Sequence, residues 1–245
     1  MIEFAGEALL LDVEGTTSSV SYVVDVLFPF ARRELYFYLR TNWNNPEVAR
    51  AREQVAQDAG ATSFEAWGGG AGLPPEYLFA QLREHLVQLM DADAKTTGLK
   101  MLQGLIWQDG YARGELKAHV YPDVPLALKA WTQANRRVAI YSSGSVLAQR
   151  LLFAHTEEGD LTSYISAYFD TTSGSKRAAA SYTAIAHSLQ APPGQVLFLS
   201  DVQIELDAAK AAGLATALVC RADSDPCPDP VRHPVIGSFD EVRMV

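Results

Sequence analysis

Two acidic residues lie close together near the N-terminus, directly after a short apolar run. Residues 8–11 read Ala-Leu-Leu-Leu, and Asp12 and Glu14 follow before a Gly-Thr-Thr turn. In extended backbone, side chains two positions apart project to the same side. Two carboxylates placed there repel each other unless a cation or a shared proton reduces the repulsion. Asp12 taken alone could equally cap a turn. The pair together favours a functional site.

Other groups that could bind phosphate or a hard metal ion occur later in the chain. Carboxylates are ligands that Mg²⁺ prefers, and ammonium and hydroxyl groups donate to phosphate oxygens. Each candidate also has an ordinary explanation. The serines could cap a helix, the lysine could be a solvated surface residue, and Asp201, Glu205 and Asp207 could stabilise a helix N-terminus. The candidates for the site are Ser142, Ser143, Lys176 and Asp201.

Apolar runs that end in polar residues place these candidates near the ends of strands. The expected strands are 8–11, 137–141, 195–199 and 215–220, with a more polar run over 164–169, and helical spacing lies between them at 146–155, 178–189 and 204–212. Strands that alternate with helices predict a mainly parallel α/β sheet. Ligands of such sheets bind beyond the carboxyl ends of the strands, so we expect the candidate residues to meet there.

The character of the chain changes between residues 20 and 116, where amphipathic helical stretches replace strand-like runs. Start signals at Asn45-Pro46-Glu47 and Pro74-Pro75-Glu76 predict helices over 48–59 and 77–90. We expect an α/β core domain of residues 1–19 and 117–245, with residues 20–116 inserted as a helical cap domain. The glycine-rich run 68–72 lacks a preceding strand and a P-loop lysine, which favours a surface connection over a phosphate cradle.

Composition narrows the class of partner. The chain has 245 residues, 48% of them hydrophobic, and a formal net charge of −9, which disfavours attraction to nucleic acid or anionic lipid. No apolar stretch is long enough to span a bilayer, and the acidic N-terminal segment is unlike a secretory signal. Cys220 and Cys227 show neither metal-ligand spacing nor a disulfide framework, which suits a reducing compartment. We expect a cytoplasmic protein with a small-molecule substrate and without nucleic-acid or membrane partners.

Read together and in this order, Asp12-x-Glu14-Gly-Thr, a strand ending in Ser142, Lys176, and Ser200-Asp201 resemble the four motifs of the haloacid dehalogenase-like hydrolases. Within this superfamily, the chain resembles one branch more closely, the acireductone-forming enolase-phosphatases of methionine salvage. Glu14 is typical of this branch, since the wider superfamily usually has Asp there. The segments that carry the similarity are 12–17, 25–32, 102–107, 141–145, 169–172 and 198–201.

The resemblance implies a haloacid dehalogenase-like Rossmannoid parallel sheet with an inserted helical cap, one Mg²⁺, and a monomer. It implies a substrate, 2,3-diketo-5-methylthiopentyl-1-phosphate, which is enolised and then dephosphorylated to 1,2-dihydroxy-3-keto-5-methylthiopentene through an aspartyl-phosphate. When the roles of the family's motifs are carried over by position, the metal-site residues are Asp12, Glu14 and Asp201. The substrate-binding residues are Ser142, Ser143 and Lys176. Asp12 is expected as nucleophile, Glu14 as acid and base, and Lys176 as the third catalytic residue.

Two other functions stay open on the sequence. One is a different phosphatase of the same superfamily, acting on phosphoglycolate or a sugar phosphate, and the matches within the cap argue against it. The other is a catalytically silent α/β binding module, which is disfavoured because nucleophile, lysine and metal acid are all present. Within the cap, Trp107 and Tyr111 could grip the methylthio end of the substrate or fill the cap core.

Overall fold

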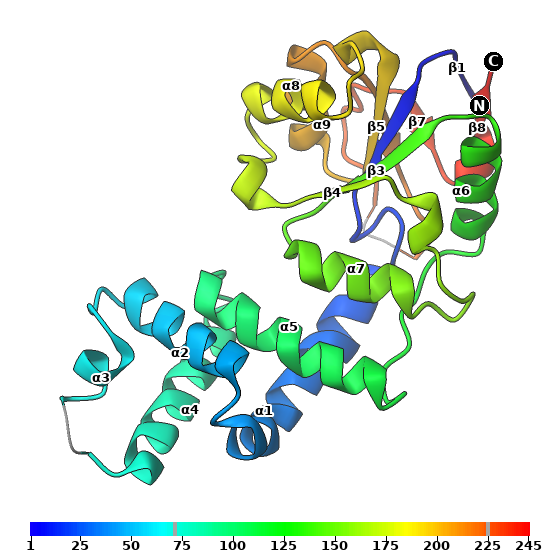
Figure 1. The fold of residues 1–245 in the computed structure, drawn as a ribbon. Coiled ribbons are helices and arrows are strands. Elements are labelled where there is room, and N and C mark those ends of the chain that lie inside the picture. Colours follow the sequence, from blue (N-terminus) through cyan, green and yellow to red (C-terminus); the bar gives the residue numbers. More distant parts are fainter. Residues whose placement is uncertain (71–72, 224–225) are drawn as a thin grey trace. The chain divides into compact units, whose positions relative to one another are not determined.

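A computed structural model of the chain describes residues 1–70, 73–223 and 226–245 (Figure 1). The chain divides into two compact units, a core unit of Met1–Val23 and Lys117–Val245 and a cap unit of Val24–Leu116. The cap unit therefore begins at residue 24, compared with residue 20 in the sequence prediction. None of the helices in the described ranges combines the length and the apolar composition that crossing a membrane requires.

The core unit is built on a parallel sheet. Within the described ranges, six strands pair in the order β4-β3-β2-β5-β6-β7, and each neighbouring pair is parallel. The central strands are continuous apolar runs, as expected for strands covered on both faces. The predicted α/β fold is confirmed. The strands are β2 (Ala8–Leu11), β3 (Arg137–Tyr141), β4 (Ala167–Phe169), β5 (Val196–Ser200), β6 (Ala215–Val219) and β7 (Val235–Ile236).

Helices cover this sheet on both sides (Figure 1). Leu10, Tyr141 and Phe198 form one buried cluster with side chains of α8 and α9. Figure 1 shows α6 on the opposite side of the sheet. Three of these helices match predicted segments, whereas α6 was not predicted. The helices of the core unit are α6 (Asp123–Gln133), α7 (Val146–Ala154), α8 (Ala179–Ser188) and α9 (Gln203–Ala211).

The shortest strands differ from the sequence prediction. Strand β4 covers only the second half of the predicted run 164–169, because Thr162–Tyr164 form a 3-10 turn. Strands β1 (Ile2–Phe4) and β8 (Val242–Met244) pair in parallel as a separate two-stranded sheet that the sequence did not predict. Segments of two or three residues are too short to display a periodicity, so only tertiary pairing defines them.

Cys220 and Cys227 form a disulfide, with their Cα atoms 5.9 Å apart. The expectation that these cysteines form no disulfide is wrong, and they no longer indicate a reducing compartment. The two cysteines lie seven positions apart in the sequence. Sequence spacing alone could not reveal that they are in contact.

The cap unit is helical. In α2, the side chain of Asn45 accepts a hydrogen bond from the amide of Glu47 at 2.8 Å, so the predicted start signal works as an N-cap. A π-helix over Tyr22–Leu27 leads into the first helix. Of the glycine-rich run 68–72, residues 71 and 72 lie outside the described ranges. The helices are α1 (Phe28–Asn42), α2 (Pro46–Asp58), α3 (Phe64–Trp67), α4 (Pro75–Asp91) and α5 (Thr97–Ala112).

Trp107 and Tyr111 belong to the interior of the cap unit. Both are buried, and the indole Nε1 of Trp107 donates to the carbonyl oxygen of Leu27 at 2.8 Å. A buried indole N–H needs such a partner. Of the two roles considered for these aromatic residues, the structure favours the cap core.

Candidate active site

Asp12 lies at the carboxyl end of β2 and is buried. Its Oδ2 accepts a hydrogen bond from the hydroxyl of Ser200 at 2.9 Å, and its Oδ1 accepts from the amide of Val13 at 2.8 Å. The backbone of Asp12 continues the pairing with β5, because its amide donates to the carbonyl of Leu199 at 3.0 Å. Both carboxylate oxygens are therefore oriented by neighbours before any ligand binds.

Lys176 is buried between two carboxylates. Its Nζ lies 2.7 Å from Oδ1 of Asp12 and 2.7 Å from Oε2 of Glu205. The backbone of Lys176 is fixed in turn, since its carbonyl accepts from the hydroxyl of Tyr182 at 2.7 Å. Burial opposes the charged form of Lys176, but the two carboxylates outweigh it and leave the pKa of Lys176 raised. The ammonium group is thus permanently charged beside Asp12.

Asp201 and Glu205 complete an acidic cluster with Asp12. Burial, followed by the charge of Asp12, raises the pKa of Asp201 to about 7 and that of Glu205 to about 7. Both directions have the same physical cause, because burial disfavours a charged carboxylate and the nearby charge of Asp12 disfavours it further. The site therefore holds excess negative charge that a cation or a proton must relieve.

Glu14 lies in the tight turn after β2. The amide of Gly15 donates to the carbonyl of Ser18 at 2.8 Å, and Gly15 has φ +70°. A Cβ atom at this position would lie 2.2 Å from Oδ2 of Asp201. Only glycine allows both the left-handed backbone and this close approach. The turn thus brings Gly15 against the Asp201 carboxylate.

Ser142 and Ser143 follow β3, the neighbour of β2 in the sheet. The amide of Ser142 donates to the carbonyl of Phe169 at 3.2 Å, and its hydroxyl accepts from the amide of Gly144 at 3.1 Å. Gln149 fixes this turn, because its Nε2 donates to the carbonyls of Gly144 and Phe169, both at 2.8 Å. The turn stands at the N-terminus of α7, a position suited to an anion.

The donor set suits a divalent cation. The Oδ1 atom of Asp201 is buried, and no hydrogen bond to it is found within the described ranges. In the same ranges, no three His, Cys, Asp or Glu side chains are grouped closely enough to hold a metal ion. The expected set Asp12, Glu14 and Asp201 therefore does not stand ready as three side chains. Asp12 and Asp201 offer carboxylate oxygens, the hard ligands that a divalent cation prefers.

The structure joins some of the predicted residues directly and adds two others. Asp12 and Lys176 are in contact, Asp201 lies against Gly15 in the turn that follows Glu14, and the serines come directly after the neighbouring strand β3. Ser200 and Glu205 were not predicted as site residues. A signal existed for Glu205, since it lies four residues after Asp201, about one helical turn along.

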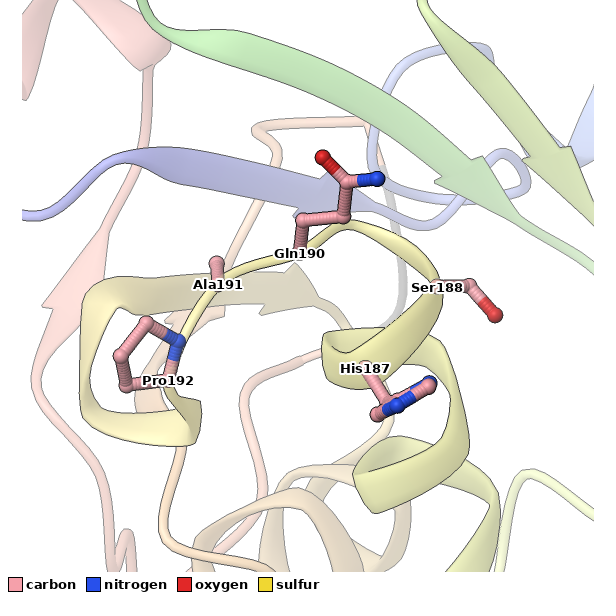
Figure 2. Close-up of a pocket in the computed structure, with 5 residues that line it drawn as sticks. All are labelled: His187, Ser188, Gln190, Ala191 and Pro192. Carbon is pink, nitrogen blue, oxygen red and sulfur yellow. The ribbon is translucent and has the colours of Figure 1, made fainter.

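An open pocket elsewhere in the core unit is separate from these residues. Figure 2 shows its lining at the C-terminal end of α8, formed by His187, Ser188, Gln190, Ala191 and Pro192. Lys176 precedes the other end of this helix, and ten helical residues span about 15 Å. The pocket is therefore not part of the candidate active site.

Comparison with known proteins defines the class. The family of haloacid dehalogenase-like hydrolases matches residues 7–213, and the chain belongs to this family. Proteins named enolase-phosphatase E1 are similar over most of the chain. The one from Pseudomonas syringae pv. syringae (strain B728a) is 47% identical, covering 88% of this chain and 89% of the relative. The one from Thioalkalivibrio sulfidiphilus is 48% identical, covering 96% of this chain and 98% of the relative.

A solved structure is also similar to this chain over nearly its whole length. The UTR4 protein from Saccharomyces cerevisiae superposes with a TM-score of 0.79 and 34% identity, covering 96% of this chain and 99% of that one. Within the hydrolase family, this chain belongs with the enolase-phosphatases. It is a phosphatase, and its family implies a divalent metal.

Proposed function

We propose that this chain is a Mg²⁺-dependent enolase-phosphatase that converts 2,3-diketo-5-methylthiopentyl-1-phosphate to 1,2-dihydroxy-3-keto-5-methylthiopentene in methionine salvage. The observation that carries the proposal is the buried Asp12, held 2.7 Å from the ammonium of Lys176 at the carboxyl end of β2. The similarity to enolase-phosphatases over 88% to 99% of the chain supports the substrate. We further propose a monomer, as the family resemblance suggests. The proposal keeps the cytoplasmic location expected from the sequence, to which the disulfide-bonded Cys220 and Cys227 lend no support.

In the phosphatase half-reaction, Asp12 is the nucleophile. A carboxylate oxygen attacks phosphorus in line, the bond from phosphorus to the substrate oxygen breaks, and an aspartyl-phosphate forms. Lys176 holds phosphoryl oxygens beside Asp12 through its permanent charge. Ser142 and Ser143 donate to the remaining oxygens from the end of β3. Ser200 keeps the Asp12 carboxylate oriented throughout.

Glu14 acts as general acid and then as general base in the phosphatase half-reaction. It donates a proton to the departing substrate oxygen and later takes one from the water that attacks the aspartyl-phosphate. Asp12, Asp201 and the carbonyl of Glu14 would hold the divalent cation. When bound, the cation neutralises charge between the nucleophile and the phosphoryl oxygens.

In the enolase half-reaction, a base removes a proton next to a carbonyl. Glu14 is our candidate for this base, since it serves the same site in the second half-reaction. Glu14→Asp withdraws the carboxylate by one methylene. We expect it to slow turnover of the diketone more than turnover of an already enolised phosphate, and equal losses would point to another base.

One assay tests the proposed function. The purified chain with Mg²⁺ is given the diketone phosphate, and the fall of diketone absorbance, the rise of enediol absorbance and the release of phosphate are recorded together. We expect all three signals, and we expect EDTA to abolish them. Asp12→Asn should release no phosphate and form no phosphoenzyme. Phosphate release from phosphoglycolate or a sugar phosphate, with none from the diketone, would instead support the other phosphatase.

A further inference from the structure

Arg221 buries its charged group directly after β6, with its side chain only 4% exposed. Nε and Nη2 donate to the carbonyl oxygen of Thr16 at 3.0 and 2.7 Å. Nη1 donates to the two carboxylate oxygens of Asp123 at 2.9 and 2.8 Å. A buried guanidinium needs a paired charge and satisfied donors, and Asp123 and Thr16 supply them. Arg221 thus ties one backbone carbonyl to one carboxylate.

The surroundings hold the guanidinium in place. Asp123 also accepts from the amide of Phe239 at 2.6 Å and from the hydroxyl of Ser238 at 3.1 Å. The guanidinium carbon lies 4.2 Å from the ring centre of Tyr121 and 4.8 Å from that of Phe239. Three segments far apart in the sequence therefore fix Arg221. Because its own position is fixed, Arg221 can fix the position of the Thr16 carbonyl to which it donates.

Arg221 holds the turn that carries the active-site acids. Thr16 is fully buried, and its Oγ1 accepts a hydrogen bond from the amide of Asp201 at 3.1 Å. One residue earlier, Gly15 passes so close that a Cβ there would lie 2.2 Å from Oδ2 of Asp201. Thr16 thus connects Arg221 to Asp201, and a small shift of Thr16 would move the turn at Gly15 relative to the Asp201 carboxylate.

We propose that Arg221 is a positioning residue that fixes the turn at residues 13–18 against Asp201 and thereby sets the affinity of the site for its divalent cation. This inference rests on the proposed metal site. Arg221 touches neither substrate nor cation in this role. It acts through the Thr16 carbonyl, which holds the turn, and through the Thr16 hydroxyl, which holds Asp201. Metal ligands held at fixed separations bind more tightly than ligands that must first be gathered.

The test is the conservative variant Arg221→Lys. Lysine keeps a positive charge for Asp123, but its single ammonium cannot reproduce the planar fork that donates to Thr16 and Asp123 together. Titration calorimetry with Mg²⁺ alone, on the full chain without substrate, measures the dissociation constant directly. We expect that constant to rise about tenfold or more, the range typical of losing an outer-shell partner of a metal site. The rate at saturating Mg²⁺ should fall by a smaller factor.

Arg137→Lys is the matched control. Arg137 also donates to backbone carbonyls, those of Leu189 and Gln190, and to a carboxylate, that of Glu7. It lies at the start of β3, the opposite end of the strand from Ser142. We expect a lower thermal midpoint and an unchanged Mg²⁺ affinity. An unchanged affinity in Arg221→Lys, or an equal loss in both variants, would overturn the inference.

Thr16→Val tests the same connection from its other end, and it serves if Arg221→Lys does not fold. Valine keeps the shape of threonine and removes the hydroxyl that accepts from the Asp201 amide. We expect weaker Mg²⁺ binding again. Should the wild type bind no Mg²⁺ and release no phosphate, the proposed function fails together with the inference. Normal wild-type binding with unaltered variants overturns the inference alone.

Discussion

The hydroxyl of Ser200 donates to Oδ2 of Asp12 at 2.9 Å, although the two residues lie 188 positions apart in the sequence. Strands β2 and β5 are adjacent and parallel, with Leu11 opposite Leu199, so the residues that follow them meet at one edge of the sheet. The same hydroxyl accepts from the amide of Val202 at 3.1 Å. Ser200 thus orients Asp12 and also shapes the turn that begins with Asp201.

Ser200→Ala removes the hydrogen bond that orients Asp12. A hydrogen bond to a charged group contributes roughly 1.5–3 kcal/mol, so we expect kcat to fall by about tenfold to a hundredfold. Steady-state phosphate release measures this loss. Ser166→Ala is the control, because its hydroxyl donates to the carbonyl of Val138 at 2.8 Å, near the start of β3. A similar fall of kcat in both variants would remove the special role of Ser200.

Lys176→Met leaves Asp12 and Glu205 facing each other without their shared cation. We expect loss of phosphatase activity and a lower thermal midpoint at pH 8, because breaking a buried ion pair costs roughly 3–5 kcal/mol. Adding Glu205→Gln removes one of the unpaired charges. The double variant should recover stability at pH 8 without recovering activity. Recovery of turnover would show that Lys176 serves only to neutralise Glu205.

The raised pKa values of Asp201 and Glu205 predict a pH-dependent stability. Both lie near 7 in the folded state, compared with 3.8 and 4.5 as ordinary values, so the folded protein binds more protons between about pH 4 and pH 7. Stability without metal should therefore be greatest at the acidic side of this window and fall as the pH rises through 7. A bound divalent cation relieves the same repulsion, and its binding competes with protons.

Thermal unfolding at pH 5.5 and pH 8 measures both effects. In EDTA, we expect a lower midpoint at pH 8 than at pH 5.5. Added Mg²⁺ should raise the midpoint more at pH 8. Equal gains at both pH values would contradict the assignment of Asp201 to the metal site.

Gly15→Ala tests the close approach of the turn to Asp201. The new Cβ would lie 2.2 Å from Oδ2 of Asp201, at a residue with φ +70°. Gly114→Ala is the matched control, since Gly114 has φ +72° and a Cβ added there would meet no atom of the described residues within 4 Å. Both variants carry the cost of a left-handed alanine, roughly 1 kcal/mol. Only Gly15→Ala should also weaken Mg²⁺ binding and phosphate release.

Gln149→Met tests the turn at Ser142. Methionine has a similar length but no amide to donate to the carbonyls of Gly144 and Phe169. We expect KM for the phosphorylated substrate to rise about fivefold to thirtyfold, which corresponds to roughly 1–2 kcal/mol of lost hydrogen bonding, with a smaller change in kcat. Gln54→Met is the control, because Nε2 of Gln54 makes one exposed hydrogen bond to Asp58 in the cap unit. Comparable changes in both variants would argue against a local effect at Ser142.

The apolar runs before Asp12, Ser142 and Asp201 determined most of the core fold by themselves. Strands buried on both faces must be continuous apolar segments, so β2, β3, β5 and β6 are visible in the sequence, and their alternation with helices predicts a parallel sheet. Parallel strands bring their carboxyl ends to one edge. This rule places Asp12, Ser142 and Asp201 near one another from the order of the segments alone.

Tertiary structure alone decided the contacts that make these residues a site. Nothing in the sequence near Glu205 shows that Lys176 lies 2.7 Å away, because that distance depends on how α9 packs beside the loop before α8. The anchoring of Thr16 by Arg221 and the Cys220–Cys227 disulfide are likewise contacts that exist only in the folded chain. Local periodicity reports which face of an element is buried, whereas partners across the fold are chosen by packing, which no short stretch of sequence encodes.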